Sequence, residues 1–233
     1  MNIQEVTELY EKRKGTINPI YYYQVIDQNK TILNYLKDSL YYLKKLNIWH
    51  IYFDKKNLDF LKEMEEYIIA YNDISLEKLI IDELYKRKYT ISCAESCTGG
   101  MIISRLIGVS GASNVINESY VTYSNEAKIR ILGVSKETID KYTVTSLEVA
   151  DEMAKGLKRI SKSNVCLSVT GFAGSGSEKL DTDGLCYFGI MMNDNNLYHE
   201  KIQVSGNRNE CRYAQSTYIL WKTLTLLKNA KGE

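Results

Sequence analysis

Glycine is distributed very unevenly along this chain of 233 residues. Gly15 is the one glycine before Gly99, and the other thirteen lie from Gly99 onward. Tight turns and close backbone approaches to a ligand depend on glycine, so the first part of the chain has little means of building a ligand-binding loop. All five cysteines lie from Cys93 onward, whereas twelve of the nineteen tyrosines fall before residue 90. We therefore divide the chain into a region 1–74 and a domain 75–233.

Composition excludes several classes of partner. Hydrophobic residues make up 44% of the chain and charged residues 25%, with a formal net charge of +1, which is the balance of an ordinary globular protein. A chain this close to neutrality gives no electrostatic reason to expect nucleic acid or an anionic membrane as partner. No apolar run is as long as a membrane span, and the N-terminus lacks the apolar stretch of a secretory signal. We therefore expect a cytoplasmic protein.

The cysteines and histidines form no recognisable framework. An odd number of cysteines in a long chain argues against a disulfide scaffold. Cys93 and Cys97 are four residues apart, but no second Cys or His pair completes a zinc set. His50 and His199 are isolated in the sequence. We expect neither a metal nor a cofactor.

Helix and strand patterns both occur in residues 1–74. The segment Thr31–Leu46 carries apolar residues at helical spacing, and the apolar, β-prone run 48–53 predicts a strand. Asp54 or Asn57 is suited to cap a following helix. The apolar face expected for that helix consists of Leu58, Leu61, Met64 and Ile68. We predict a small N-terminal α/β appendage without site chemistry of its own.

Aromatic residues are the most prominent feature of this appendage. A piece of this size buries only a small share of its surface, so Tyr21–Tyr23, Trp49 and Phe53 are expected to need cover. Either the larger domain or a homo-oligomer interface, where aromatics are enriched, would supply it. We expect a structural or assembly role for residues 1–74.

Helices and strands alternate in the domain 75–233. Apolar residues recur at helical spacing in five segments, and the remaining apolar runs are short and β-prone. The expected helices are 75–88, 101–108, 125–132, 147–160 and 210–227. The expected strands are 89–94, 119–123, 165–169, 185–192 and 197–204. This alternation predicts an α/β fold, a three-layer α/β/α sandwich with a central mixed sheet.

The segment Ala94–Gly100 places a serine in a tight turn between a strand and a helix. Ser96 is thus expected near a helix N-terminus, where free backbone N–H groups can hold a phosphate or stabilise an oxyanion. Alternatively, Ser96 or Thr98 is simply the N-cap of the helix, because serine is a preferred N-cap residue.

The segment Tyr123–Lys128 runs from a strand end into the next helix. A lysine can act as a base on a serine hydroxyl when burial or nearby cations lower its pKa. Taken alone, the segment is better explained as a strand end with an Asn125 cap and a solvated lysine.

Two later segments offer anion-binding groups. The loop that begins Thr170-Gly171-Phe172-Ala173-Gly174 combines glycines with hydroxyls, which suits a phosphate or ribose. It matches neither the dinucleotide-binding fingerprint nor a P-loop. Arg208 and Arg212 open the last helix four residues apart and could grip a phosphate together, although surface arginines are the alternative.

These four segments, in this order, resemble the C-terminal domain family of the competence/damage-inducible protein CinA. The family pattern has Ala-Glu-Ser-Cys-Thr-Gly-Gly, Tyr-Ser-Asn-x-x-Lys, Thr-Gly-x-Ala-Gly and Gly-x-Arg-x-x-x-Arg. Here these stand as Ala94–Gly100, Tyr123–Lys128, Thr170–Gly174 and Gly206–Arg212, and the resemblance covers about residues 75–230. Stand-alone relatives in that family are nicotinamide-nucleotide amidases.

The resemblance implies a serine amidase that deamidates nicotinamide mononucleotide without metal or cofactor. Ser96 is then the nucleophile and Lys128 its base, and Tyr123 assists proton transfer or orients the pair. Thr170 and backbone N–H groups of its loop, or those after Ser96, hold the oxyanion and substrate, and Arg208 or Arg212 meets the phosphate. The substrate-binding residues implied in the turns are Thr98, Gly99, Gly100, Asn125, Gly171, Ala173 and Gly174.

The chain departs from the family in two places. The loop 175–183 lacks the prolines usual after Gly174, and residues 1–74 are too short and too poor in glycine for the molybdopterin-binding-like domain of full-length CinA. Two other functions therefore stay open. One is a non-catalytic nucleotide-binding module of a competence or repair pathway, and the other is a serine amidase for another small amide.

Overall fold

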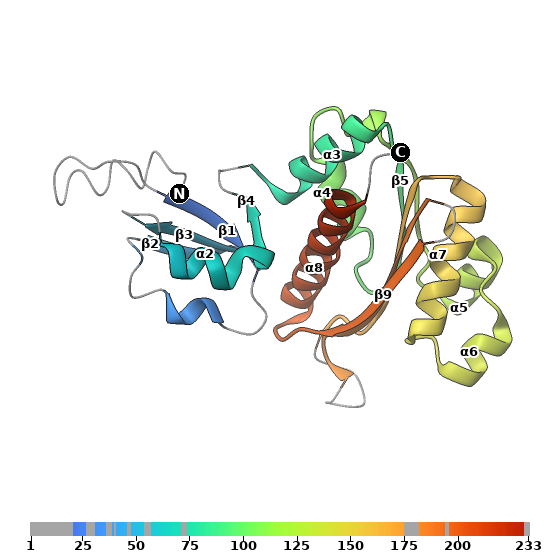
Figure 1. Cartoon of the computed structure of the whole chain (residues 1–233). Coiled ribbons are helices and arrows are strands. Elements are labelled where there is room, and N and C mark those ends of the chain that lie inside the picture. The colour runs from blue at the N-terminus through green and yellow to red at the C-terminus, as the bar shows by residue number, and fades with distance from the viewer. Residues whose placement is uncertain are drawn as a thin grey trace. The chain divides into compact units, whose positions relative to one another are not determined.

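The chain forms two compact units, Met1–Leu76 and Glu77–Glu233, each with its own β-sheet (Figure 1). In the computed structural model, the described residues are 21–26, 31–35, 39, 41–45, 48–53, 57–70, 74–174, 182–193 and 196–230. The loop 175–183, whose sequence departs from the family, lies outside the described residues except for its last two.

The first unit contains a four-stranded antiparallel sheet in the order β2-β3-β1-β4. Its strands are β1 (Tyr21–Val25), β2 (Tyr41–Lys45), β3 (Ile48–Phe53) and β4 (Ile68–Ala70). Its helical segments are the 3-10 turns Thr31–Asn34 and Glu65–Tyr67 and the helix α2 (Leu58–Met64). Its core consists of Val25, Ile32, Ile51, Phe53, Phe60 and Met64. The small α/β unit therefore has a hydrophobic core of its own.

One expectation for this unit is wrong, and a second is right only in part. The helix expected over Thr31–Leu46 is a single 3-10 turn followed, after a gap in the described residues, by strand β2. Pairing with β3 along its whole length decides the structure of β2, because tertiary context overrides a weak helical pattern. The expected helix face is confirmed at Met64, which is buried, and at Leu61, which packs against the core. It is wrong at Leu58, which is exposed, and at Ile68, which packs against the core from β4 and not from the helix.

The cap of α2 and the buried aromatic residues of the first unit agree with what their residue types predict. Asn57 caps α2, because its side chain accepts a hydrogen bond of 2.9 Å from the backbone N–H of Phe60. Phe53 is buried within this unit and its ring lies 5.1 Å from that of Phe60. Trp49 packs at the edge of the same core. The side chains of Tyr21–Tyr23 lie outside what the structure describes.

The second unit contains a five-stranded mixed sheet in the order β6-β5-β7-β8-β9. Its strands are β5 (Ile91–Glu95), β6 (Ile116–Val121), β7 (Val165–Gly171), β8 (Leu185–Met192) and β9 (Asn196–Gln203). Strand β5 is parallel to both β6 and β7, while β8 and β9 are antiparallel to their neighbours. The sheet is therefore parallel on one side and antiparallel on the other, which confirms the mixed sheet.

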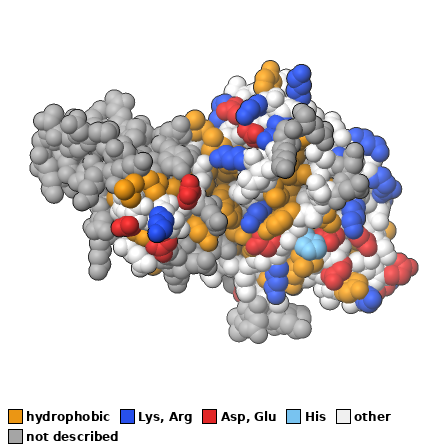
Figure 2. Space-filling view, viewed as in Figure 1, with side chains coloured by type: hydrophobic (Ala, Val, Ile, Leu, Met, Phe, Trp, Pro, Cys, Tyr) orange, Lys and Arg blue, Asp and Glu red, His pale blue; other side chains and the backbone are white. Residues whose placement is uncertain are grey.

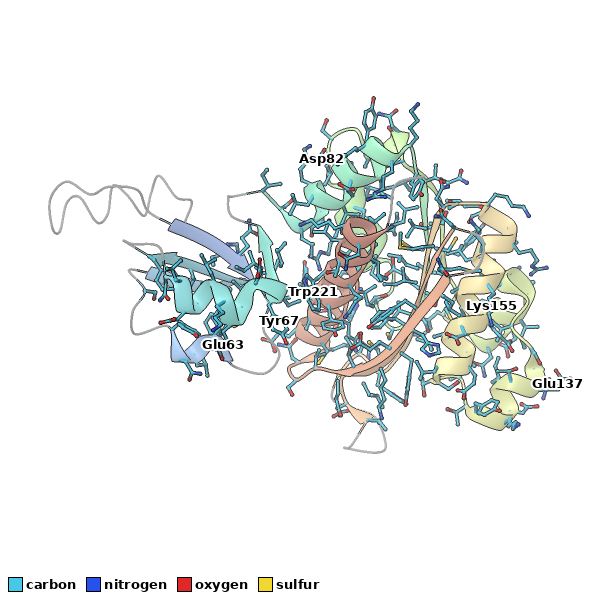
Figure 3. The ribbon with its side chains drawn as sticks, viewed as in Figure 1. Glu63, Tyr67, Asp82, Glu137, Lys155 and Trp221 are labelled. Atoms are coloured by element: carbon cyan, nitrogen blue, oxygen red, sulfur yellow. The ribbon has the colours of Figure 1, made fainter. Side chains whose placement is uncertain are left out.

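Helices cover both faces of this sheet (Figure 1). One face carries α3 (Leu76–Arg87), α4 (Met101–Ile107) and α8 (Arg208–Asn229). The other carries α5 (Asn125–Ala127), a π-helix (Lys128–Leu132), α6 (Lys136–Tyr142) and α7 (Leu147–Ser161). Figure 3 shows Trp221 on α8 and Lys155 on α7 on opposite sides of the sheet. The three-layer α/β/α arrangement is confirmed, with α6 as a helix that the sequence pattern did not indicate.

Helix α7 approaches the π-helix unusually closely at Gly156. A Cβ atom at this position would lie 1.9 Å from the carbonyl oxygen of Leu132, the last residue of the π-helix. Arg159 on the same helix donates a 3.1 Å hydrogen bond from Nη2 to that carbonyl. Glycine is therefore required here by space, and α7 sets the position of the π-helix that begins at Lys128.

We predict that Gly156→Ala lowers the free energy of unfolding by about 2 kcal/mol, because the added methyl group overpacks backbone that cannot move aside. Helix propensity alone would favour alanine by about 1 kcal/mol. A loss of stability would therefore show that the close contact, and not helix propensity, decides the effect. Urea unfolding measures it, and Lys155→Ala on the exposed side of α7 is the matched control. A variant as stable as the wild type would show that the close contact with Leu132 does not exist.

Candidate active site

Three of the four motif segments meet at the carboxyl ends of neighbouring parallel strands. Ser96 directly follows β5, and its N–H donates to the carbonyl of Val169 in β7 over 3.0 Å. Thr122 directly follows β6 and donates from its N–H to the carbonyl of Glu95 over 2.8 Å. Since carboxyl ends of parallel strands lie on one edge of a sheet, segments far apart in sequence are brought together there.

Lys128 and Ser96 form a buried pair. Lys128 Nζ lies 3.1 Å from Ser96 Oγ. The lysine side chain is fully buried, and Ser96 is 8% exposed. The same Nζ also contacts the carbonyl oxygens of Thr122 at 2.8 Å and Tyr123 at 3.2 Å. The nitrogen therefore has three polar partners, two of which can only accept hydrogen bonds.

This set of partners suits the lysine in either protonation state. A neutral amine donates its two N–H groups to the carbonyls of Thr122 and Tyr123 and keeps a lone pair for the hydroxyl hydrogen of Ser96. Burial lowers the pKa of Lys128 from its usual 10.5 to about 8, because removal from water disfavours the charged form. Lys128 can thus act as a base towards Ser96 near neutral pH.

A π-helix begins at Lys128, directly after the short helix α5, which Ser124 caps through a bond from the N–H of Ala127. The π-helix ends at Leu132, before Gly133 in the left-handed region. π-helical turns are rare and often occur at functional sites. Sequence periodicity predicted a helix over 125–132 but could not indicate this change of winding.

The turn after Ser96 has most of its polar groups occupied by the protein itself. The Glu95 carboxylate is buried and accepts from the backbone N–H groups of Ile102 and Ile103, at 3.1 and 2.9 Å, and from the Thr98 hydroxyl at 2.7 Å. The first amides of α4 are therefore not available to a ligand, unlike the expectation for a serine before a helix. Glu95 is a structural residue of this turn that sequence reasoning did not single out.

A pocket of about 320 Å³ opens beside the Ser96–Lys128 pair. Its residues come from the ends of β5 and β7, the β6–α5 turn, the α6–α7 connection and the start of α8. They are Ser96, Cys97, Tyr123, Asn125, Lys128, Val144, Thr145, Thr170, Gly171, Phe172, Ala173, Gly174 and Arg208. This volume lies at the lower end of the range of small-molecule pockets.

The pocket separates the expected site residues into two groups. Nine of them line it, from all four motif segments, whereas four expected to bind substrate do not. Those four are Thr98, Gly99, Gly100 and Arg212. Residues that line the pocket without having been expected are Cys97, Val144, Thr145 and Phe172. Cys97 and Phe172 lie within motif segments, but Val144 and Thr145 carry no sequence signal, since only the tertiary structure brings their connection to the pocket.

Tyr123 acts on the lysine through its backbone. Its carbonyl accepts from Lys128 Nζ, while its side chain is 62% exposed and its hydroxyl accepts a 3.3 Å hydrogen bond from Arg208 Nη2. The contact of Tyr123 with the lysine is thus made by its carbonyl, while its hydroxyl bonds to Arg208. The phenol and the guanidinium form a pair at the rim of the pocket.

The loop after β7 forms part of the wall of the pocket. The Thr170 hydroxyl donates to the carbonyl of Val144 over 2.9 Å, and the N–H of Phe172 donates to the carbonyl of Leu185 over 2.7 Å. A Cβ atom at Gly174, where φ is +105°, would lie 2.9 Å from the Cα of Arg208. The loop is thereby packed against the start of α8, and the Thr170 hydroxyl supports the wall.

All five cysteines are buried and reduced, and burial raises the pKa of each thiol. Cys97 is the one cysteine among the pocket residues, and its pKa is raised to about 12. The thiolate is the reactive form of cysteine. Cys97 is therefore a poor nucleophile here although it adjoins Ser96.

The described residues offer no set for metal binding and no membrane span. Within them, no three or more His, Cys, Asp and Glu side chains are grouped so as to hold a metal ion. None of the helices in the described part combines the length and apolar character needed to cross a bilayer. On the face shown in Figure 2, basic and acidic side chains are interspersed over the second unit rather than gathered by sign.

The fold and the buried pair define a class of α/β proteins with a serine and a lysine at the carboxyl end of a mixed sheet. The family model of the CinA C-terminal domain matches residues 73–227, and this chain belongs to that family. The resemblance inferred from the four motifs is thus confirmed.

Several relatives and solved structures are similar to the chain. It is 41% identical over 183 residues to a CinA-like protein of Petrotoga mobilis, which covers 75% of this chain and 44% of the relative. It is 46% identical over 154 residues to a putative competence-damage inducible protein of Alkaliphilus oremlandii, 66% of this chain and 37% of the relative. The chain thus spans less than half the length of these relatives.

Two crystal structures show the same fold. The competence/damage inducible protein CihA from Agrobacterium tumefaciens is 32% identical, with a TM-score of 0.62 over 66% of this chain and 96% of that one. A CinA superfamily protein from Klebsiella pneumoniae is 22% identical, with a TM-score of 0.64 over 66% and 97%. The second likeness concerns the fold alone.

We predict that none of the five cysteines of the folded chain reacts readily with iodoacetamide at pH 8, because burial keeps each of them as a shielded thiol. Mass spectrometry should find the native chain largely unmodified, and the unfolded chain modified at all five positions. Fast alkylation confined to Cys97 would contradict its burial and make it a rival nucleophile.

Proposed function

We propose that this chain hydrolyses the carboxamide of nicotinamide mononucleotide to nicotinate mononucleotide and ammonia. The observation that carries the proposal is the buried Lys128 Nζ at 3.1 Å from Ser96 Oγ, beside a pocket that also contains Arg208. The resemblance of the four motif segments to nicotinamide-nucleotide amidases supplies the substrate. The names of these relatives, CinA-like protein and putative competence-damage inducible protein, state no reaction.

Acylation begins with the neutral form of Lys128. Its lone pair takes the hydroxyl proton of Ser96 while Oγ attacks the carboxamide carbon, giving a tetrahedral oxyanion. The lysine, now an ammonium, remains hydrogen-bonded to the carbonyls of Thr122 and Tyr123. It then gives the proton to the departing nitrogen, so that ammonia leaves and an ester on Ser96 remains.

Deacylation repeats the proton transfers with water. Lys128, neutral again, takes a proton from a water molecule that attacks the ester carbon, and returns it to Ser96 Oγ as the acid leaves. The hydrogen-bond partners of Lys128 Nζ are a hydroxyl and two backbone carbonyls rather than a carboxylate. With a pKa of about 8, the lysine can both take up and release a proton near neutral pH. No oxidant or reductant enters either step.

The oxyanion requires donors that are still free. Ser96, Gly99 and Phe172 already use their N–H groups on the carbonyls of Val169, Ser96 and Leu185, and Thr170 uses its hydroxyl on the carbonyl of Val144. We propose that the other backbone N–H groups of the two turns that line the pocket, those after Ser96 and after Thr170, stabilise the oxyanion.

The other end of the substrate carries a phosphate, and Arg208 is suited to bind it. Arg208 is the one arginine among the pocket-lining residues, and it stands in the first turn of α8, whose positive end favours an anion. Its contact with the Tyr123 hydroxyl keeps the guanidinium at the pocket rim. Asn125 is a further polar residue of the pocket lining.

We predict that Ser96→Ala and Lys128→Met each lower kcat for ammonia release from nicotinamide mononucleotide by about a thousandfold or more, because a nucleophile and its base act as a unit. Glutamate-dehydrogenase-coupled ammonia detection measures the rate, and circular dichroism checks the fold. Cys97→Ala is the matched control beside the nucleophile and should retain most activity. Retention of most activity by either of the first two variants would overturn the assignment of the pair.

The pH dependence of the reaction should report Lys128. Only its neutral form is a base, and with a pKa of about 8 roughly a tenth of the molecules are in that form at pH 7. We predict that kcat/KM rises with pH and levels off above about pH 9, since activity is lost as pH falls through the pKa of the base. Initial rates at several pH values, with stability checked at each, would reveal a flat or falling profile if Lys128 is not the base.

A further inference from the structure

Arg212 does not line the pocket but bonds to the turn 96–100, which begins at Ser96 and is called the nucleophile turn below. Its Nε and Nη2 atoms donate to the carbonyl oxygen of Thr98 at 3.1 and 2.9 Å. We infer that Arg212 is a positioning residue for Ser96, and that it fixes the turn from which the serine attacks. The inference rests on the proposed role of Ser96 as nucleophile and assigns Arg212 a part different from phosphate binding.

Both the side-chain hydroxyl and the backbone carbonyl of Thr98 are hydrogen-bonded. Its hydroxyl donates to the buried Glu95 carboxylate at 2.7 Å, and its carbonyl accepts the two bonds from Arg212. The Thr98 side chain is fully buried. The residue can therefore neither rotate its peptide group nor shift towards solvent while these hydrogen bonds are in place.

A short hydrogen-bonded turn links the position of Thr98 to that of Ser96. The N–H of Gly99 donates to the carbonyl of Ser96 over 3.0 Å, and the N–H of Ser96 is anchored on Val169. Thr98 is two residues after Ser96, so its peptide is part of the same turn. A movement of the Thr98 carbonyl would displace Ser96 Oγ relative to Lys128 Nζ, a distance of 3.1 Å.

Gly99 makes room for the guanidinium. Its φ is +61°, and a Cβ atom there would lie 3.3 Å from Arg212 Nη2. The flat guanidinium group thus packs against the backbone of the turn. Lysine cannot reproduce this arrangement, because its ammonium is a compact point charge without a planar pair of donors.

Most of the donors of Arg212 are already used within the protein. A guanidinium has five N–H donors, and the bonds to Thr98 and to Asn209 Oδ1 use three of them. Arg212 is also absent from the residues that line the pocket, whereas Arg208, one turn earlier on α8, is among them. The two arginines of this motif therefore divide the work, with Arg208 facing the ligand and Arg212 facing the nucleophile turn.

The test compares Arg212→Met and Arg212→Lys with the wild-type chain in two assays. The first is ammonia release from nicotinamide mononucleotide, analysed for kcat and KM separately. The second is the rate at which an uncharged alkyl fluorophosphonate labels Ser96, followed by mass spectrometry. This reagent carries no phosphate anion, so its rate reports the nucleophile and not anion binding. Arg87→Met, which removes an arginine paired with Glu83 at 2.8 Å on α3, is the matched control.

We expect Arg212→Met to lower kcat and the labelling rate by about 10- to 100-fold, since small misplacements of a nucleophile cost that much, with KM within about twofold of wild type. Arg212→Lys should recover part of the loss in both assays. Arg87→Met should match the wild type. Arg208→Met should instead raise KM for the nucleotide, which is the pattern of lost ground-state binding.

The outcomes separate this inference from the proposed function. If Arg212→Met, or Arg212→Lys where the methionine variant does not fold, labels at the wild-type rate or raises KM with kcat unchanged, the positioning role is wrong. If wild-type Ser96 is labelled but no ammonia is released, the substrate is wrong and the labelling rates still decide the role of Arg212. If wild-type Ser96 is not labelled, both the nucleophile and its positioning residue are overturned.

Discussion

The burial of Lys128 is the constraint on which the rest of this site depends. A fully buried lysine nitrogen must have polar partners, since an unpaired buried ionisable group is costly. Two backbone carbonyls and Ser96 Oγ supply them here. The carbonyls belong to the residues that follow β6, the serine follows β5, and the π-helix carries the lysine between them. Gly156 lets α7 pack on the end of that π-helix, so the packing within this helical layer and the position of the lysine are set together.

Helix α8 organises the pocket from one of its faces. Arg208, Arg212 and Gln215 are separated by four and three residues, which places them on one side of a helix. Arg208 lines the pocket and Arg212 holds the Thr98 carbonyl. The Gln215 amide donates to the carbonyls of Phe172 and Gly184, the two sides of the loop after β7. The single helix α8 therefore contacts the pocket, the nucleophile turn and the loop after β7.

Much of the second unit could be predicted from the chain because its patterns are strong and local. The strand Leu185–Met192 and the start of helix α7 at Leu147 lie where periodicity indicated. The first unit was less predictable, since a short tyrosine-rich segment becomes a strand only when a partner strand is present. Helix α6 was missed because seven residues carry too few apolar positions to show a period. Neither case involves unusual residues, and both were decided by pairing or packing.

The sequence by itself determined the fold class, the family and the candidate pair Ser96 and Lys128, because these depend on local periodicity and on motifs that are contiguous in the chain. Only the tertiary structure decided which polar groups of those motifs are free. Glu95 takes the first amides of α4, Thr170 supports a wall, and Arg212 holds a carbonyl instead of lining the pocket. The physical reason is that a hydrogen-bonding group is committed by its nearest partner in space, and those partners lie from 7 to 114 residues away along the chain.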